Sequence, residues 1–253
     1  MSTPFDTDAV RAAWDRAADA YAEGQATGRD IYRYEVFGPA QMALCGDVAG
    51  ARLLDVGCGA GYFARAMAER GARVTAIDLS PRLLEHARAG GGPVDYRLLD
   101  AEAIAEAFPP GSFDVVTSCF SLQDMPDPPR VLAAVAAVLA PGGRVVVSSA
   151  HPCTDMPYRR WQQDAAGAKQ ALAVDRYFER GPLRYDWSGW LYPFTTAGLH
   201  VPLEDWFAWF RAAGLVVHAL REPAPPPEAI ARHPELEDAA RVPYFILFDL
   251  RRA

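Results

Sequence analysis

Leu53-Leu54-Asp55-Val56-Gly57-Cys58-Gly59-Ala60-Gly61 is the stretch that decides the fold. The apolar run that ends at Val56 predicts a buried strand, and apolar residues at helical spacing begin directly after Gly61. Glycines at alternate positions between the two allow positive φ angles and let a ligand lie against bare backbone. The helix behind the turn supplies free N–H groups and a partial positive charge. The stretch therefore predicts a ligand-binding turn.

The glycine spacing separates two kinds of nucleotide-binding turn. A dinucleotide turn has Gly-x-Gly-x-x-Gly, which would place its third glycine where this chain has Tyr62. The third glycine here is Gly61, and Asp55 precedes the first glycine by two residues. Asp-x-Gly-x-Gly-x-Gly resembles the first motif of class I S-adenosylmethionine-dependent methyltransferases. A tight turn in an unrelated α/β protein is the alternative.

The resemblance implies that the glycine turn holds the methionine end of S-adenosylmethionine, with Asp55 near its amino group. The turn residues expected to bind this cofactor are Asp55, Gly57, Cys58, Gly59 and Gly61.

A second carboxylate is expected to bind the ribose of the cofactor. Arg73 to Ile77 predicts the second strand, and Asp78 follows it. A carboxylate at this place can accept hydrogen bonds from both ribose hydroxyls, because it has two acceptor oxygens. The resemblance implies the same role for Asp78 and packing of Leu79 on the adenine ring. A helix cap is the alternative role for Asp78.

The third strand is expected over Val94 to Leu98, with Asp100 and Ala101 just beyond it. The resemblance implies that Asp100 lies near the adenine amino group and that the Ala101 backbone lies beside the ring nitrogen. Asp100 could instead cap the helix that follows.

Strands and helices alternate through most of the chain, which predicts an α/β fold with a doubly wound, Rossmann-like sheet. Pro141-Gly142-Gly143 is expected to end a helix over Pro128 to Leu139. The resemblance implies a seven-stranded sheet in the order 3-2-1-4-5-7-6 with strand 7 antiparallel. The last four strands are predicted at Phe113–Ser118, Arg144–Ser149, Leu215–Leu220 and Pro243–Arg251.

The 253 residues are expected to form a single domain with four parts. These are an N-terminal helical cap (1–45), a cofactor-binding core (46–150), an acceptor-side lid (151–200) and the last part of the sheet (201–253). Gly24 and Gly28 are expected to break the first cap helix. The lid is too rich in Trp and Tyr for a disordered linker. A folded insertion that serves stability or dimer contact is the alternative.

Aromatic and polar residues outside the glycine turn complete the expected site. Tyr21 and Phe120 are predicted to contact the cofactor. Phe120 and Tyr62 are candidates for lying near its sulfonium, which aromatic faces attract. The residues predicted to contact the methyl acceptor are Tyr34, Gln123, Tyr158 and Trp161. Packing in the protein core is the alternative for the aromatic residues.

Two histidines are the candidates for a general base. His151 follows the fifth strand, and His200 precedes an amphipathic helix near the same edge of the sheet. Histidine titrates near neutral pH, which suits proton transfer. A His-Pro pair at this place is similar to one in a group of bacterial small-molecule methyltransferases. The alternative for both is a hydrogen bond that shapes the loop.

Composition and net charge limit the kinds of partner, metal site and cellular location that the sequence favours. A net charge of −7 disfavours a nucleic-acid surface. The four cysteines are scattered without a Cys-x-x-Cys pair, so neither a metal site nor a disulfide framework is expected. No signal segment or membrane span is apparent, which makes the cytoplasm the expected location. A homodimer is a further expectation.

These observations predict methyl transfer from S-adenosylmethionine to N or O of a small, partly aromatic or apolar molecule, with a role in secondary metabolism as one setting. The reaction would be an in-line displacement in which the protein aligns the reactants and excludes water. A non-catalytic sensor or scaffold that binds S-adenosylmethionine is one alternative. A nicotinamide-dependent oxidoreductase is another.

Overall fold

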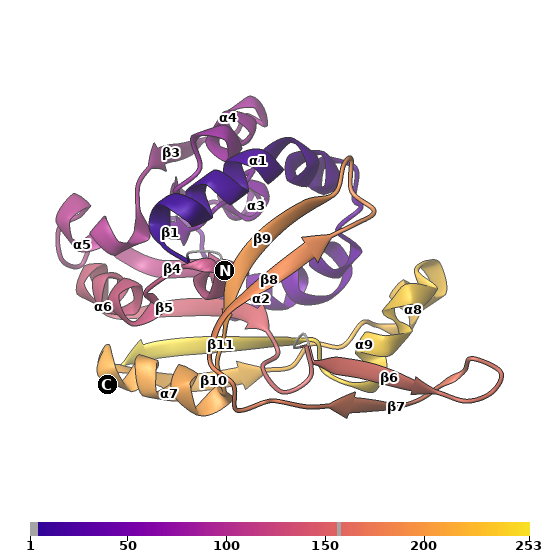
Figure 1. Cartoon of the computed structure of the whole chain (residues 1–253). Helices are drawn as coiled ribbons and strands as arrows, with labels where there is room; N and C mark the ends of the chain where they lie inside the picture. The colour runs from indigo at the N-terminus through magenta and orange to yellow at the C-terminus, as the bar shows by residue number, and fades with distance from the viewer. Residues whose placement is uncertain (1–4, 156–157) are drawn as a thin grey trace.

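The computed structural model describes residues 5–155 and 158–253. Its central sheet has the order β10-β11-β5-β4-β1-β2-β3 (Figure 1). All pairs of neighbouring strands are parallel except those of β11, which runs antiparallel to β5 and β10. The predicted order 3-2-1-4-5-7-6 is therefore confirmed. The strands are β1 (Arg52–Val56), β2 (Arg73–Asp78), β3 (Val94–Leu98), β4 (Phe113–Cys119), β5 (Leu139–Ala150), β10 (Leu215–Arg221) and β11 (Phe245–Arg252).

The sheet is buried on both faces, as a parallel sheet requires. In β1, Leu54 belongs to one apolar core and the adjacent Leu53 to a second core on the other face, and both are fully buried. The helices and helical turns of the α/β part are α3 (Tyr62–Glu69), α4 (Pro81–Ala89), η2 (Ala101–Ala103), α5 (Ile104–Ala107), η3 (Leu122–Asp124), α6 (Pro128–Val138) and α7 (Leu203–Ala212).

The turn at Pro141-Gly142-Gly143 differs from the expectation that it ends a helix. Helix α6 already ends at Val138, and β5 begins at Leu139. Phe113 of β4 pairs with Leu139, whereas Val115 pairs with Arg144. The residues between Leu139 and Arg144 therefore form a bulge inside the strand.

The N-terminal cap consists of α1 (Thr7–Ala26), the π-helical turn η1 (Arg33–Phe37) and α2 (Gly38–Cys45). Asp6 starts α1 by accepting a hydrogen bond from the Ala9 N–H at 2.9 Å. Gly24 does not break the helix, contrary to the expectation, and α1 continues to Ala26. Its missing side chain makes room for the Trp190 ring, since a Cβ at Gly24 would lie 2.2 Å from that ring.

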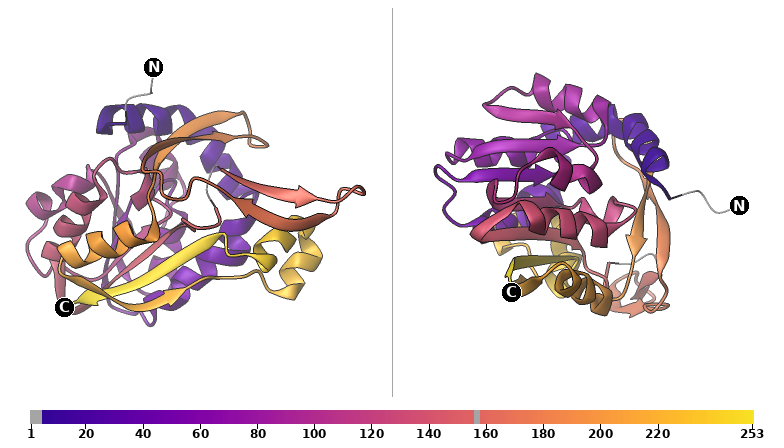
Figure 2. Two further views of the ribbon diagram at one scale, coloured as in Figure 1. Left: turned by 60° about the horizontal axis from the view of Figure 1, so that its bottom comes forward. Right: turned by 90° about the vertical axis from the view of Figure 1, so that its left-hand side faces the viewer.

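Two antiparallel hairpins lie between β5 and α7, β6 (Arg159–Gln163) with β7 (Lys169–Val174) and β8 (Gly181–Trp187) with β9 (Phe194–His200). Figures 1 and 2 show β8–β9 beside α1, while β6–β7 extends away from the sheet near α9. The segment between β10 and β11 contains α8 (Pro227–Arg232), η4 (Pro234–Leu236) and α9 (Glu237–Arg241). In the described ranges, no helix has the length and apolar character needed to cross a membrane.

Candidate functional site

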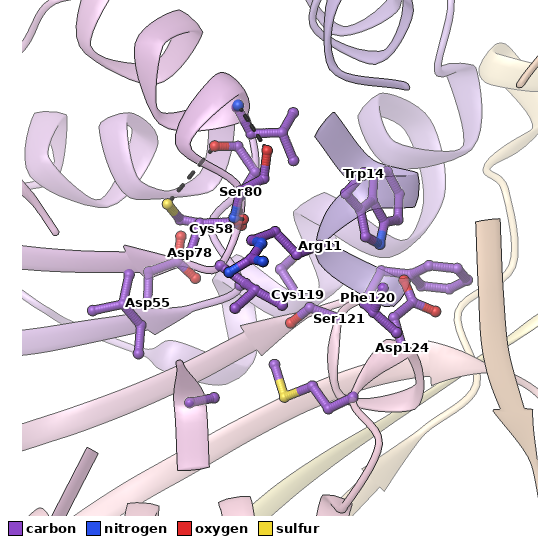
Figure 3. Close-up of a pocket in the computed structure, with 18 of the residues that line it drawn as sticks. Arg11, Trp14, Asp55, Cys58, Asp78, Ser80, Cys119, Phe120, Ser121 and Asp124 are labelled. Atoms are coloured by element: carbon purple, nitrogen blue, oxygen red, sulfur yellow. Dashed lines mark hydrogen bonds between the residues drawn. The ribbon is translucent and has the colours of Figure 1, made fainter. Parts of the chain in front are cut away.

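A pocket opens at the carboxyl ends of β1, β2 and β4, beneath the first cap helix (Figure 3). This is the sheet edge at which doubly wound folds bind ligands. Most residues predicted to bind the cofactor line this one pocket, namely Tyr21, Asp55, Gly57, Cys58, Gly59, Asp78, Leu79, Asp100, Ala101 and Phe120.

The glycine turn is shaped by its neighbours as well as by its own backbone. Gly57 has a φ of 71°, and a Cβ on it would lie 2.5 Å from the Cβ of Ser121. The N–H groups of Gly57 and Cys58 both donate to the carbonyl of Ile77, at 2.9 and 3.0 Å. Gly61 does not line the pocket; a Cβ there would lie 2.4 Å from the Tyr96 hydroxyl. Gly61 therefore allows close packing behind the turn.

Asp55 lines the pocket and has an acceptor without a partner. Its side chain is fully buried, and Oδ1 accepts a hydrogen bond from the Thr117 hydroxyl at 2.9 Å. No described residue donates to Oδ2. Burial raises the pKa of Asp55 to about 7. A buried carboxylate oxygen without a partner is costly, and a ligand ammonium group would satisfy it.

Asp78 is held in place by the glycine turn. Its Oδ2 accepts from the Gly59 N–H at 2.7 Å, and its Oδ1 accepts from the Ser80 N–H at 2.9 Å. Burial raises the pKa of Asp78 to about 6, against the opposing effect of these hydrogen bonds. Ser80, and not Asp78, caps α4 by accepting from the Leu83 N–H. Each oxygen of Asp78 keeps an acceptor position for a ligand hydroxyl.

Asp100 caps a helical turn and also lines the pocket. It caps η2 by accepting from the Glu102 N–H at 3.0 Å, and it also lines the pocket beside Leu99 and Ala101.

Phe120 has a left-handed backbone at the pocket wall, with a φ of 57°. Its N–H donates to the Ser148 hydroxyl at 3.0 Å, and its ring stacks on Phe37 with centroids 5.1 Å apart. Such strain in a non-glycine residue is common at functional sites, where the surrounding structure enforces it.

Arg33 is a pocket residue that the sequence analysis did not identify. Its guanidinium is buried, with Nε 2.8 Å from Asp30 and an N–H donated to the Tyr21 hydroxyl at 2.6 Å. The available signal was the Asp30–Arg33 pair in an aromatic segment of the cap. Gln25, Ser121 and Met125 also line the pocket and were not predicted.

The two candidate bases lie outside the pocket lining. The Nδ1 of His151 accepts the Cys153 N–H at 3.2 Å, and its Nε2 lies 2.9 Å from Glu222. The Nε2 of His200 lies 3.0 Å from the Tyr177 carbonyl. These contacts match the loop-shaping alternative, because both rings are committed to neighbouring protein groups.

The four residues predicted to contact the acceptor also lie outside this pocket lining. Tyr34 donates to the Gln25 carbonyl and packs edge-on against Tyr62. Gln123 is buried in η3. Tyr158 lies under the guanidinium of Arg176, and Trp161 donates to the Tyr244 hydroxyl at 3.2 Å.

Similarity to known proteins agrees with this geometry. Residues 54–147 match the family model described as a methyltransferase domain. An S-adenosylmethionine-dependent methyltransferase from Mesorhizobium loti is 32% identical, with a TM-score of 0.73 over 85% of this chain and 96% of that one. The chain belongs to the S-adenosylmethionine-dependent methyltransferases. S-adenosylmethionine is accordingly the cofactor, and the unpartnered oxygen of Asp55, the glycine turn at Gly57 and the carboxylate of Asp78 fit it.

Two further comparisons place this methyltransferase among its relatives. The ubiquinone biosynthesis O-methyltransferase of Xanthomonas euvesicatoria pv. vesicatoria is 47% identical over 107 residues, which cover 41% of this chain and 44% of that protein. The match thus spans less than half of the relative. A 1,6-didemethyltoxoflavin-N1-methyltransferase from Burkholderia thailandensis is 19% identical, with a TM-score of 0.58 over 100% of this chain and 93% of that one, and it shares the fold.

Proposed function

We propose that this methyltransferase transfers a methyl group to the hydroxyl oxygen of a small molecule. The observation that carries the proposal is the buried, unpartnered oxygen of Asp55, which lines the same pocket as Asp78 at the ends of adjacent strands. The first carboxylate suits an ammonium group and the second suits ribose hydroxyls. Transfer to oxygen is supported by the likeness to the ubiquinone biosynthesis O-methyltransferases.

The residues of the chain would bind, orient and dehydrate the reactants. When bound, S-adenosylmethionine supplies a methyl group activated by its sulfonium. The turn at Gly57 and Gly59 would receive the methionine end, Asp78 the ribose, and Leu79 with Asp100 the adenine. The aromatic rings of Trp14, Tyr21 and Phe120 would keep water from the reacting atoms.

The acceptor would enter on the side of the pocket that β9 covers. Strand β9 packs against both α1 and η3, so cap and hairpin together close the space above the strand ends. We propose this hairpin, rather than the whole segment 151–200, as the lid. The β6–β7 hairpin interacts instead with α9, through the ion pair of Lys169 with Asp238.

The test is cofactor binding followed by turnover. Isothermal titration calorimetry with S-adenosylhomocysteine should give a complex for the wild type and an affinity about 10- to 100-fold lower for Asp78→Ala, because the ribose loses a charged acceptor. Asp95→Asn is the matched control, since Asp95 is exposed on β3 and pairs only with Arg97 in the described structure. Unchanged affinity in Asp78→Ala would show that the cofactor is misplaced. Transfer of labelled methyl to a phenol tests the reaction itself.

A further inference from the structure

Asp124 is a pocket carboxylate that the cofactor assignment leaves without a role. It ends η3, directly after β4, and lines the pocket. Figure 3 shows it beside Phe120 and Ser121 on the Trp14 side, across from Asp55 and Asp78. It is therefore separate from the two carboxylates that suit the cofactor.

The lid hairpin fixes this carboxylate from behind. A Cβ on Gly198 of β9 would lie 2.7 Å from Asp124 Oδ1 and 3.0 Å from the Tyr185 ring. Only glycine leaves room for the carboxylate at this crossing of β9 and η3. The packing therefore restricts the carboxylate to the space in front of β9, where the pocket lies.

No cation neutralises Asp124 within residues 5–155 and 158–253. No described group forms an ion pair or a side-chain hydrogen bond with it. The two arginines of the pocket are held elsewhere: Arg33 lies 2.8 Å from Asp30, and Arg11 lies 2.8 Å from Asp8. The titratable groups that face it are Tyr21 of α1 and Tyr185 of β8. Burial raises the pKa of Asp124 well above its ordinary value.

A partly buried carboxylate without a partner is a stronger base than a fully exposed one, because proton uptake removes an uncompensated charge from a poorly solvated site. The surrounding walls are Trp14, Phe120 and Met125, which suit a flat apolar body. Together these features favour an acceptor with an aromatic ring that carries a hydroxyl group, whose proton the carboxylate can accept.

We propose that Asp124 is the general base of this methyltransferase and that the acceptor is a phenol. This inference rests on the proposed O-methyl transfer. In the step, the acceptor oxygen bonds to the methyl carbon, and the methyl–sulfur bond breaks with its electron pair left on sulfur. The hydroxyl proton passes to Asp124. One positive sulfonium and one negative carboxylate thus become a neutral thioether and a neutral carboxylic acid.

The experiment compares wild type, Asp124→Asn and Asp124→Glu on three probes: 4-methylphenol, 2-naphthol and 4-nitrophenol. The pH is set above the pKa of 4-nitrophenol and below those of the other two. Asp124→Asn should lower turnover of the weakly acidic phenols by about 100-fold or more, since general base catalysis has this size. The defect should shrink to below about 10-fold for 4-nitrophenol, which is already ionised and needs no base. Asp124→Glu should recover part of the activity.

Two measurements separate this proposal from the function on which it rests. Calorimetry with S-adenosylhomocysteine should give Asp124→Asn the wild-type affinity, and thermal denaturation should show that it folds. Gly198→Ala, which pushes on the carboxylate, should lower turnover and keep cofactor affinity. Failure of the wild type to bind S-adenosylhomocysteine would overturn the proposed function.

Three results would overturn the base alone. The first is an equal defect of Asp124→Asn on all three phenols, and the second is no defect. The third is a wild type that binds S-adenosylhomocysteine yet methylates none of the phenols. This third result includes the case in which the enzyme methylates the cationic probe benzylamine instead. That last case would make Asp124 a binder of cationic acceptors.

Discussion

Trp190 stacks on Tyr21, with ring centroids 5.7 Å apart and ring planes 18° from parallel. The contact joins the tip of the β8–β9 hairpin to helix α1, and through Tyr21 it reaches the pocket wall. Two hydrogen bonds support it: Tyr192 donates to the Arg16 carbonyl at 2.9 Å, and Arg29 donates to the Gly189 carbonyl at 3.0 Å. Cap and lid are thus one connected cover.

Gly24 is expected to be essential to this cover. Alanine normally stabilises a helix interior by about 1 kcal/mol relative to glycine. Here a Cβ would lie 2.2 Å from the Trp190 ring, so Gly24→Ala should destabilise the protein instead. In a Trp190→Ala background the same change should be neutral or stabilising. Urea denaturation of the four proteins measures the coupling. Additive effects would mean that the ring does not pack on Gly24.

Gly50, which lies in the turn before β1, is a matched control for Gly57 in the glycine turn. Their φ angles are 73° and 71°, so alanine suffers the same left-handed strain at both. At Gly57 the Cβ would also lie 2.5 Å from Ser121, whereas at Gly50 nothing lies within 4 Å. Gly57→Ala should therefore lower S-adenosylhomocysteine affinity by at least about 10-fold, and Gly50→Ala should leave it unchanged. Calorimetry on both variants checks this; equal losses would assign the effect to backbone strain alone.

The parts of this protein that sequence predicts best depend on near neighbours. The strand ending at Val56 and the positive φ of Gly57 follow from local patterns, and the structure has both. The sheet order followed from family resemblance, which added the antiparallel last strand that local patterns do not specify.

The remaining features depend on residues far along the chain. Gly24 reads as a helix breaker until Trp190 is seen against it. His151 reads as a base until Glu222 is seen 2.9 Å from its ring. Asp124 can be recognised as a candidate base only when Gly198 of β9 is seen packed against its carboxylate. Each case needs the position of a partner that no short window of sequence contains.

The ionisation of Asp55 should make stability depend on pH. Its folded pKa of about 7 lies above its ordinary value, so the protonated form is favoured on folding. Its contribution is present in acid and is lost as pH rises toward 7, on the order of 2–3 kcal/mol between about pH 5 and about pH 7. Thermal denaturation without cofactor should show a fall over this window that is smaller in Asp55→Asn. An equal fall would mean that Asp55 is ionised throughout.

The same group should make cofactor affinity depend on pH in the opposite direction. A ligand ammonium group favours ionised Asp55, so S-adenosylhomocysteine affinity should rise as pH increases through about 7 in the wild type. Asp55→Asn should bind more weakly and lose most of this rise, with a residual from Asp78, whose pKa is about 6. Calorimetry across the window measures both. A rise that persists unchanged in Asp55→Asn would place the ammonium elsewhere.

His151 is expected to act on stability and not on turnover. Its ring is buried, accepts the Cys153 N–H and lies against Glu222, and it is outside the pocket lining. His151→Ala should lower the free energy of unfolding by about 1–3 kcal/mol, because it leaves a void and an unpaired N–H. Turnover and S-adenosylhomocysteine affinity should stay within about threefold of the wild type, because the ring does not line the pocket. A threefold change corresponds to less than the 1.4 kcal/mol that a factor of ten requires.

Urea denaturation, calorimetry and methyl transfer on one preparation of His151→Ala separate the two roles. Asp124→Asn is the comparison variant, because it should keep normal cofactor affinity, as His151→Ala does, but lose turnover. A His151→Ala protein with normal stability, normal affinity and turnover reduced by about 100-fold or more would restore His151 as the base. It would also require the loop after β5 to move, because the His151 Nε2 atom is in hydrogen-bond contact with Glu222 and outside the pocket lining.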